Sequence, residues 1–247
     1  MKALAALTPR TRRRHANSTK PPVLVRLESV SLCYPQGGTA IRDLSFRIRG
    51  GETWRVFSDD NRINANLLKC ISGLQSPEIG TVKIWGHVSW PMGQVAGISD
   101  KLSCEANSRF FASVYGQGEE EELHLMRQLC DFDGKHWNHP FSELSADAKQ
   151  QFKLALSLVL DFDLYVMDPV TLLGLHRRGA WTDHWQGLLQ RRLKERAIIT
   201  LGHDKFGVSD QCKKGLILRK GRIEFIGPLE RCQVLWSEGE KEDCLGV

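Results

Sequence analysis

The segment between residues 54 and 73 constrains the fold of this chain more than any other. Residues 54–57 have the pattern of an apolar strand, a short polar loop follows, and residues 65–73 have the apolar spacing of a helix. This order is typical of phosphate-binding sites, whose loops follow the pattern G-x-x-x-x-G-K-[ST]. Here the pattern would place glycines at 58 and 63, a lysine at 64 and a hydroxyl at 65. The chain instead has Ser58, Ile63, Asn64 and Ala65. No other segment matches the pattern. The strand–loop–helix order of a phosphate-binding site is therefore present without the residues that bind phosphate.

Strand and helix patterns alternate along the rest of the chain. The predicted strands are 24–32, 41–48, 54–57, 81–85, 164–167, 197–201, 215–218 and 222–225. The predicted helices are 65–73, 102–115, 119–132, 146–160, 180–194 and 228–236. Apolar strands that alternate with helices indicate an α/β fold with a largely parallel sheet covered on both faces. Antiparallel elements are expected near the N-terminus and near residues 216–226.

Composition narrows the class of protein. A chain of 247 residues can form one large α/β domain or two small ones. No apolar run approaches the roughly 20 residues that span a bilayer, so any membrane role is expected to be peripheral. The seven cysteines include no C-x-x-C pair, which argues against a zinc site and suits a reducing cytosol.

The charged residues gather at the two ends of the chain. Residues 1–22 form a basic segment without an acid, interpreted as a flexible tail, and residues 238–247 form an acidic tail. The basic tail can serve solubility alone, or it can contact anionic lipid head groups. No aromatic residues interleave its cations, so a specific nucleic-acid site is not expected.

Short motifs in the right order identify a family resemblance. They are Gly51-Glu52, the run from Leu67 to Leu74, Pro77 to Val82, Val88-Ser89-Trp90-Pro91, Asp161 to Asp168, and Val170-Thr171. Together they resemble the nucleotide-binding domain of ABC transporters, and within it the branch that exports capsule or O-antigen polysaccharides. The resemblance implies a P-loop NTPase-like fold over residues 23–237, with a mostly parallel core sheet, an antiparallel β subdomain and a helical subdomain at about residues 95–160.

The resemblance also implies a site for ATP and Mg. Its phosphate loop falls on Ser58, Asp59, Asp60, Asn61, Arg62, Ile63, Asn64, Ala65 and Asn66. Tyr34 matches the aromatic that stacks on adenine, but it can equally be a surface aromatic packed before a proline turn. Asp168 matches the magnesium-associated aspartate and His203 the switch histidine, and both are interpreted as remnants of that site rather than as ordinary polar residues at strand ends. Ser145 matches a phosphate donor of the signature motif, but a role as a helix cap is the preferred interpretation.

The family's chemical groups are replaced at several of these positions. Asn64 stands in place of the phosphate-binding lysine, and Asp59 and Asp60 add negative charge that only Arg62 opposes. Pro169 stands in place of the catalytic glutamate, and proline has neither a side-chain group that can accept a proton nor a backbone N–H that can donate a hydrogen bond. At two further positions Leu175 replaces an aspartate and Asp147 replaces a glycine. The sequence therefore predicts weak or absent ATP hydrolysis.

Three functions remain open at this point. The chain can be a degenerate ABC subunit that docks a membrane permease and has a structural or regulatory role. It can also be an active exporter ATPase in which Arg62 or Lys69 replaces the usual lysine. Thirdly, it can be a soluble scaffold outside transport. The first implies a homodimer or heterodimer of ABC subunits and a cytoplasmic position on the inner face of the bacterial plasma membrane.

Overall fold

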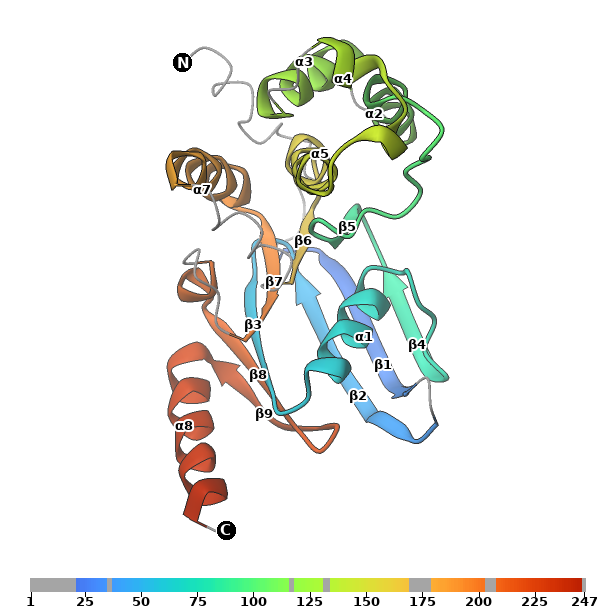
Figure 1. The fold of residues 1–247 in the computed structure, drawn as a ribbon. Coiled ribbons are helices and arrows are strands. Elements are labelled where there is room, and N and C mark those ends of the chain that lie inside the picture. Colours follow the sequence, from blue (N-terminus) through green and yellow to red (C-terminus); the bar gives the residue numbers. More distant parts are fainter. Residues whose placement is uncertain are drawn as a thin grey trace. The chain divides into compact units, whose positions relative to one another are not determined.

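The computed structural model describes residues 21–34, 37–115, 118–130, 134–168, 179–202 and 208–245. Contacts between residues divide the chain into two compact units. The helical unit contains residues 92–162 and helix α7 (Gly179–Leu193), and the sheet unit contains all the strands. Figure 1 labels the elements of both units. The predicted helical subdomain at about residues 95–160 falls within the helical unit, which also includes α7.

A three-stranded antiparallel sheet forms one part of the sheet unit. Its order is β2-β1-β4, with β1 at Val23–Cys33, β2 at Thr39–Arg49 and β4 at Ile79–Ile84. Both neighbours of β1 run antiparallel to it, and Leu27 lies between Phe46 and Val82 in the ladder. The predicted strands in these ranges and the predicted antiparallel pairing are therefore confirmed.

A six-stranded sheet forms the other part, with the order β5-β6-β7-β3-β8-β9. Its strands are β3 (Thr53–Ser58), β5 (Val88–Pro91), β6 (Leu164–Met167), β7 (Ala197–Leu201), β8 (Lys214–Arg219) and β9 (Arg222–Pro228). The first five strands in this order are parallel, and β9 is antiparallel to β8. This confirms the largely parallel sheet. Strand β5 was not predicted, because its four residues are too few to show a period.

Alternate residues of the central strands point to two different cores. Trp54 and Val56 of β3 join a large cluster with β1, β2 and helix α1 (Asn61–Ile71). Phe57 points to the opposite face and packs with Leu229 and Cys232 of helix α8 (Leu229–Leu245). The period of two in a strand therefore lets α1 and α8 cover opposite faces of β3.

Helix α8 corrects one predicted boundary. Its predicted end was residue 236, but the helix continues to Leu245 through the acidic segment. The acidic residues after 237 therefore extend a helix over most of the predicted C-terminal tail. Local propensity explains this, because Glu and Lys are good helix formers. Residues 237–245 contain four of them and no proline.

The helical unit is held together by ion pairs as well as by apolar packing. Its helices besides α7 are α2 (Cys104–Val114), α3 (Glu119–Cys130), α4 (Gly134–Asn138) and α5 (Ala146–Val159). Glu105 of α2 binds Arg109 at 3.0 Å and Arg127 of α3 at 2.7 Å. Hydrogen bonds from Arg109 and Arg127 lower the pKa of Glu105. Within the described parts of the chain, every helix is too short or too polar to cross a lipid bilayer.

Glu52 anchors the entry to β3 and provides a test of the sheet unit. Its carboxylate accepts hydrogen bonds from Lys214 Nζ at 2.6 Å, the Arg49 N–H at 2.9 Å and Trp54 Nε1–H at 3.1 Å. Burial acts to raise the pKa of Glu52, but these three hydrogen bonds lower it below its usual value of 4.5. A carboxyl whose pKa is lower in the folded state stabilises the fold above its unfolded pKa, and that stability is lost as the pH falls through the folded pKa.

We expect Glu52→Gln to lower the free energy of unfolding at pH 7 by about 1–2 kcal/mol, because a charged acceptor is lost. The difference between the variant and the parent should shrink as the pH falls below about 4.5, where Glu52 becomes protonated in the unfolded state. Urea denaturation at pH 7 and at pH 3.5 measures both values. A difference that is the same at the two pH values would contradict this role for the carboxylate.

Candidate functional site

The candidate site lies at the carboxyl end of β3, where the chain turns into α1. Ser58 is the last residue of β3, Asp59 and Asp60 form the turn, and α1 begins at Asn61. The helix was predicted to begin at residue 65, so this expectation is wrong by one turn of helix. The six residues from Asn61 to Asn66 that were assigned to a phosphate loop belong to the first turns of α1.

The head of α1 is closed by hydrogen bonds of its own chain. The Ser58 hydroxyl accepts a hydrogen bond from the Asp60 N–H at 3.2 Å, and the Asn64 N–H donates to the Asp60 carbonyl at 3.3 Å. A phosphate loop works in the opposite way, because its glycines leave several backbone N–H groups free to point at the anion. In this chain the Asn64 N–H, at the position of the family's lysine, already donates a hydrogen bond within its own chain.

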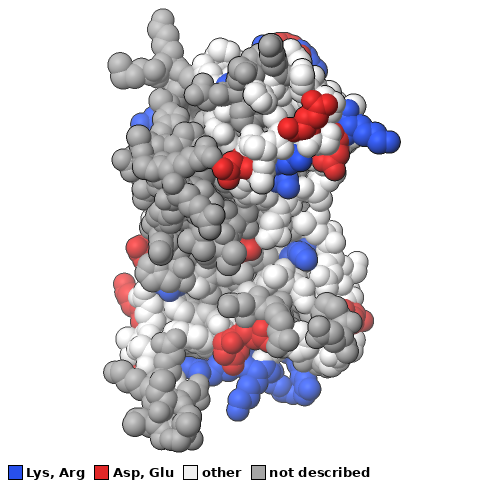
Figure 2. All heavy atoms as spheres, in the orientation of Figure 1, with Lys and Arg blue, Asp and Glu red and all other residues white. Residues whose placement is uncertain are grey.

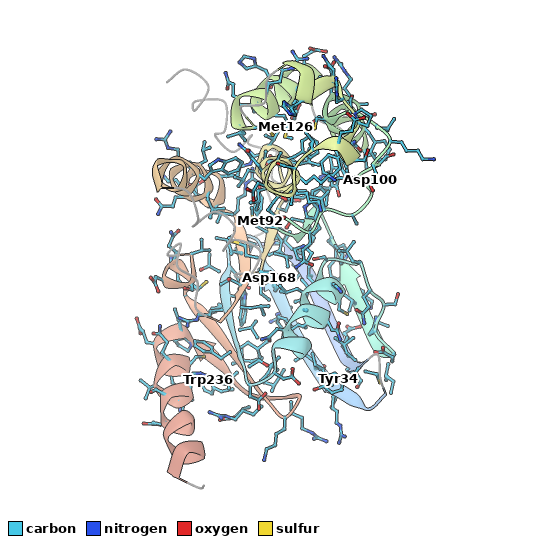
Figure 3. The ribbon with its side chains drawn as sticks, in the orientation of Figure 1. Tyr34, Met92, Asp100, Met126, Asp168 and Trp236 are labelled. Carbon is cyan, nitrogen blue, oxygen red and sulfur yellow. The ribbon has the colours of Figure 1, made fainter. Side chains whose placement is uncertain are left out.

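Two further contacts tie the turn to distant parts of the sheet unit. The Tyr34 hydroxyl donates to Asp60 Oδ2 at 2.7 Å, and the Lys220 N–H donates to Asp59 Oδ2 at 3.3 Å. Figure 3 labels Tyr34 below α1, and Figure 2 shows acidic side chains above basic ones at the lower end of the same view. The two carboxylates therefore accept hydrogen bonds from their own chain, at the place where a bound phosphate would be expected to accept hydrogen bonds from the protein.

Asn64 is buried at the position of the expected lysine. The residue is 6% exposed, and its Oδ1 atom has no hydrogen-bond partner among the described residues. A neutral amide at this place cannot supply the charge that a lysine gives to the β- and γ-phosphates. Lys69 does not replace it, because that residue lies in the last turn of α1 and is exposed. The side chain of Arg62 lies outside the described parts.

The remaining predicted site residues are placed as follows. Asp168 follows β6 directly, at the carboxyl edge of the parallel strands, and is labelled in Figure 3. Ser145 caps α5, because its hydroxyl accepts from the Ala148 N–H at 3.2 Å, and this confirms its predicted capping role. Ser145 lies in the helical unit and Asp168 in the sheet unit. Pro169, Leu175 and His203 lie outside the described residues.

The sequence contained a signal for the early start of α1 that the motif comparison missed. Ser58, Asp59 and Asp60 are residue types that favour helix N-caps, and they stand together immediately before Asn61. Aligning this segment to a phosphate loop gave those residues a ligand-binding role. The contacts of Tyr34 and Lys220 had no comparable signal, because they join residues 26 and 161 positions apart.

The fold defines the class of protein to which the chain is similar. A solved ATP-binding subunit of an ABC transporter superimposes with a TM-score of 0.68 and 19% identity, over 87% of this chain and 93% of the other. A dimeric ATP-binding cassette, MJ0796, solved with ADP and Pi, gives a TM-score of 0.64 and 17% identity, over 83% and 99%. The chain therefore has the fold of ABC ATPase domains. No protein-family model matches it.

Curated relatives specify the branch. The capsule polysaccharide export ATP-binding protein CtrD of Neisseria meningitidis is 26% identical over 81% of this chain and 92% of its own length. The polysialic acid transport ATP-binding protein KpsT of Escherichia coli is 24% identical, over 85% and 93%. The homologues of this chain are thus ABC ATP-binding proteins of capsule and polysaccharide export.

Proposed function

We propose that the chain is an ABC-type subunit of a polysaccharide exporter that has lost nucleotide chemistry and works through contacts with other subunits. The relatives in capsule and polysialic acid export support the transport assignment. The loss of nucleotide chemistry rests on one observation, which is that α1 begins at Asn61 and uses the backbone that a phosphate loop leaves free. This subunit would lie in the cytoplasm against the inner membrane face and dock a permease subunit.

The residues present do not fit ATP and Mg. The turn before α1 offers two carboxylates, Asp59 and Asp60. The positions of the expected lysine and hydroxyl are occupied by the buried amide of Asn64 and by Ala65. Ala65 cannot ligate a metal ion, and two like charges at contact distance cost about 4 kcal/mol at an effective dielectric of 20. Asp168 is the one remaining carboxylate of the expected metal site within the described residues.

Steady-state assays of phosphate release test the proposal. The purified chain is expected to release phosphate from Mg-ATP no faster than a buffer control, and Asp168→Asn is expected to give the same rate. Turnover at about 1 per second or more, within the usual range of enzymes, would overturn the proposal if Asp168→Asn abolished it. The variant is the necessary control, because a contaminating ATPase would not respond to it.

The same assay, combined with co-purification, separates the two alternatives from the proposal. An active exporter ATPase with unconventional chemistry would hydrolyse ATP and depend on Asp168. A scaffold outside transport would not hydrolyse ATP and would also fail to co-purify with a membrane permease when the full chain is isolated from its own cells. Recovery of the chain with a permease, together with absent hydrolysis, is the result expected of a degenerate transport subunit.

A further inference from the structure

The outer face of the three-stranded sheet carries three cations in one row across its strands. Arg26 of β1 lies directly opposite Arg47 of β2 and directly opposite Lys83 of β4. The side chains of Arg26 and Lys83 are each 54% exposed, and Arg47 is exposed as well. Val25 and Leu27, the neighbours of Arg26 along β1, lie in the core on the other face. The three strands lie side by side in Figure 1, and we call these three cations the basic row.

The positive charge of the basic row is offset in part by one carboxylate. Like charges directly opposite each other destabilise a sheet. Glu28 of β1 lies beside the row, with Oε1 2.8 Å from Arg26 Nε and Oε2 3.1 Å from Lys83 Nζ. Hydrogen bonds from Lys83 and Thr81 lower the pKa of Glu28, so this carboxylate is charged at neutral pH. No ion-pair partner of Arg47 is found among the described residues. Three cations and one carboxylate leave two positive charges in excess.

We propose that the basic row binds an acidic segment of a partner protein. The contacts of Glu28 show how this face holds a carboxylate, which accepts hydrogen bonds from a lysine and from the Thr81 hydroxyl at 3.2 Å and pairs with an arginine. Acidic side chains three or four residues apart on a helix lie about 5–6 Å from each other. Neighbouring strands lie about 4.8 Å apart, so such a segment can bring successive carboxylates to Arg47, Arg26 and Lys83.

Two other kinds of anion fit the basic row less well. Proteins that bind single-stranded nucleic acid stack its bases on aromatic side chains, and the row itself contains none. An anionic lipid surface attracts cations in any arrangement, so it does not account for three cations held in register around one bound carboxylate. The charge and the spacing of the row therefore favour an acidic polypeptide.

Fluorescence anisotropy of labelled poly-L-glutamate with the full chain at low salt tests the proposal. The chain should bind this probe, and Arg47→Glu should weaken the binding at least about fivefold, because an attraction becomes a repulsion. The variant is expected to fold, since it turns a like-charge pair with Arg26 into an opposite-charge pair. Lys101→Glu is the matched control, because it changes the net charge equally and Lys101 is exposed in the helical unit. No binding by the parent chain, or equal weakening by the two variants, would overturn the proposal.

Removal of the competing carboxylate gives a change in the opposite direction. Glu28→Gln should tighten the binding of poly-L-glutamate about two- to threefold, because Arg26 and Lys83 then pair with the probe instead of with Glu28. Glu230→Gln is the control, since it changes the net charge equally and Glu230 is exposed on α8. An equal effect of the two variants would show that net charge, rather than the basic row, determines the binding, and would contradict the proposal.

The same variants distinguish the kind of anion that the basic row binds. Arg47→Glu should weaken the binding of poly-L-glutamate more than the binding of phosphatidylserine vesicles or of a thymidine oligonucleotide with the same number of charges. A larger loss with the vesicles or with the oligonucleotide would assign the row to that anion and overturn the proposal. These assays contain no ATP, and the row lies away from the head of α1 on the strands of the antiparallel sheet. Their result is therefore independent of the proposed loss of ATP chemistry.

Discussion

Calorimetric titration of the purified chain with Mg-ATP is expected to show no binding heat at nucleotide concentrations up to about 1 mM. A dissociation constant of about 1 mM corresponds to a binding free energy of about −4 kcal/mol. The main reason is the backbone. The Asn64 N–H is bonded to the Asp60 carbonyl, so the group at the lysine position is not available to a phosphate. The negative charge of Asp59 and Asp60 opposes binding further, although solvent screens the exposed Asp59.

A charge-neutral variant separates these two causes. Asp59→Asn with Asp60→Asn removes both negative charges while keeping side chains that can cap α1. We expect this double variant to remain unable to bind Mg-ATP, because it does not restore glycines, a lysine or a hydroxyl. Binding by the double variant alone would show that charge, rather than the early helix start, prevents binding. Saturable binding by the parent chain with one nucleotide per chain would contradict both causes.

Gly221→Ala is expected to lower the free energy of unfolding by about 3 kcal/mol, the second large effect. Gly221 lies in the turn between β8 and β9 with φ +74°. An added Cβ would overlap the carbonyl oxygen of Ala40, which is backbone and cannot rotate away. The Gly221 carbonyl also accepts a hydrogen bond from the Arg42 N–H at 2.8 Å, so the turn joins the six-stranded sheet to β2.

Gly202→Ala is the matched control for this substitution. Gly202 also has a positive φ, +53°, but an added Cβ there would meet no atom of the described residues within 4 Å. Its cost should be about 1 kcal/mol, from backbone strain alone. Urea denaturation of both variants isolates the steric term by difference. Equal losses of stability in the two variants would show that the contact between the turn and β2 is not a determinant of stability.

The order of the elements could be predicted from local patterns. Residues 164–167 and 197–201 are short runs in which all residues but Thr200 are apolar or aromatic, and they form buried strands with the predicted bounds. The parallel arrangement followed because helices separate these runs. Strand β5 could not be predicted in this way, since it is short and depends on pairing with β6. The continuation of α8 to Leu245 was missed because composition suggested a tail, although its residues favour a helix.

By itself the sequence determined which chemical groups are missing from the candidate site. Asn64, Ala65 and Pro169 lack the charge, hydroxyl and carboxylate that ATP chemistry needs, and no fold can supply them at those positions. Only the tertiary structure decided what replaces them. The hydrogen bonds of Asp60 with Tyr34 and of Asp59 with Lys220 join residues far apart in the chain, so no local pattern contains them. They arise because packing of the two sheets around α1 brings three separate segments to the end of β3, where their polar groups bond to one another.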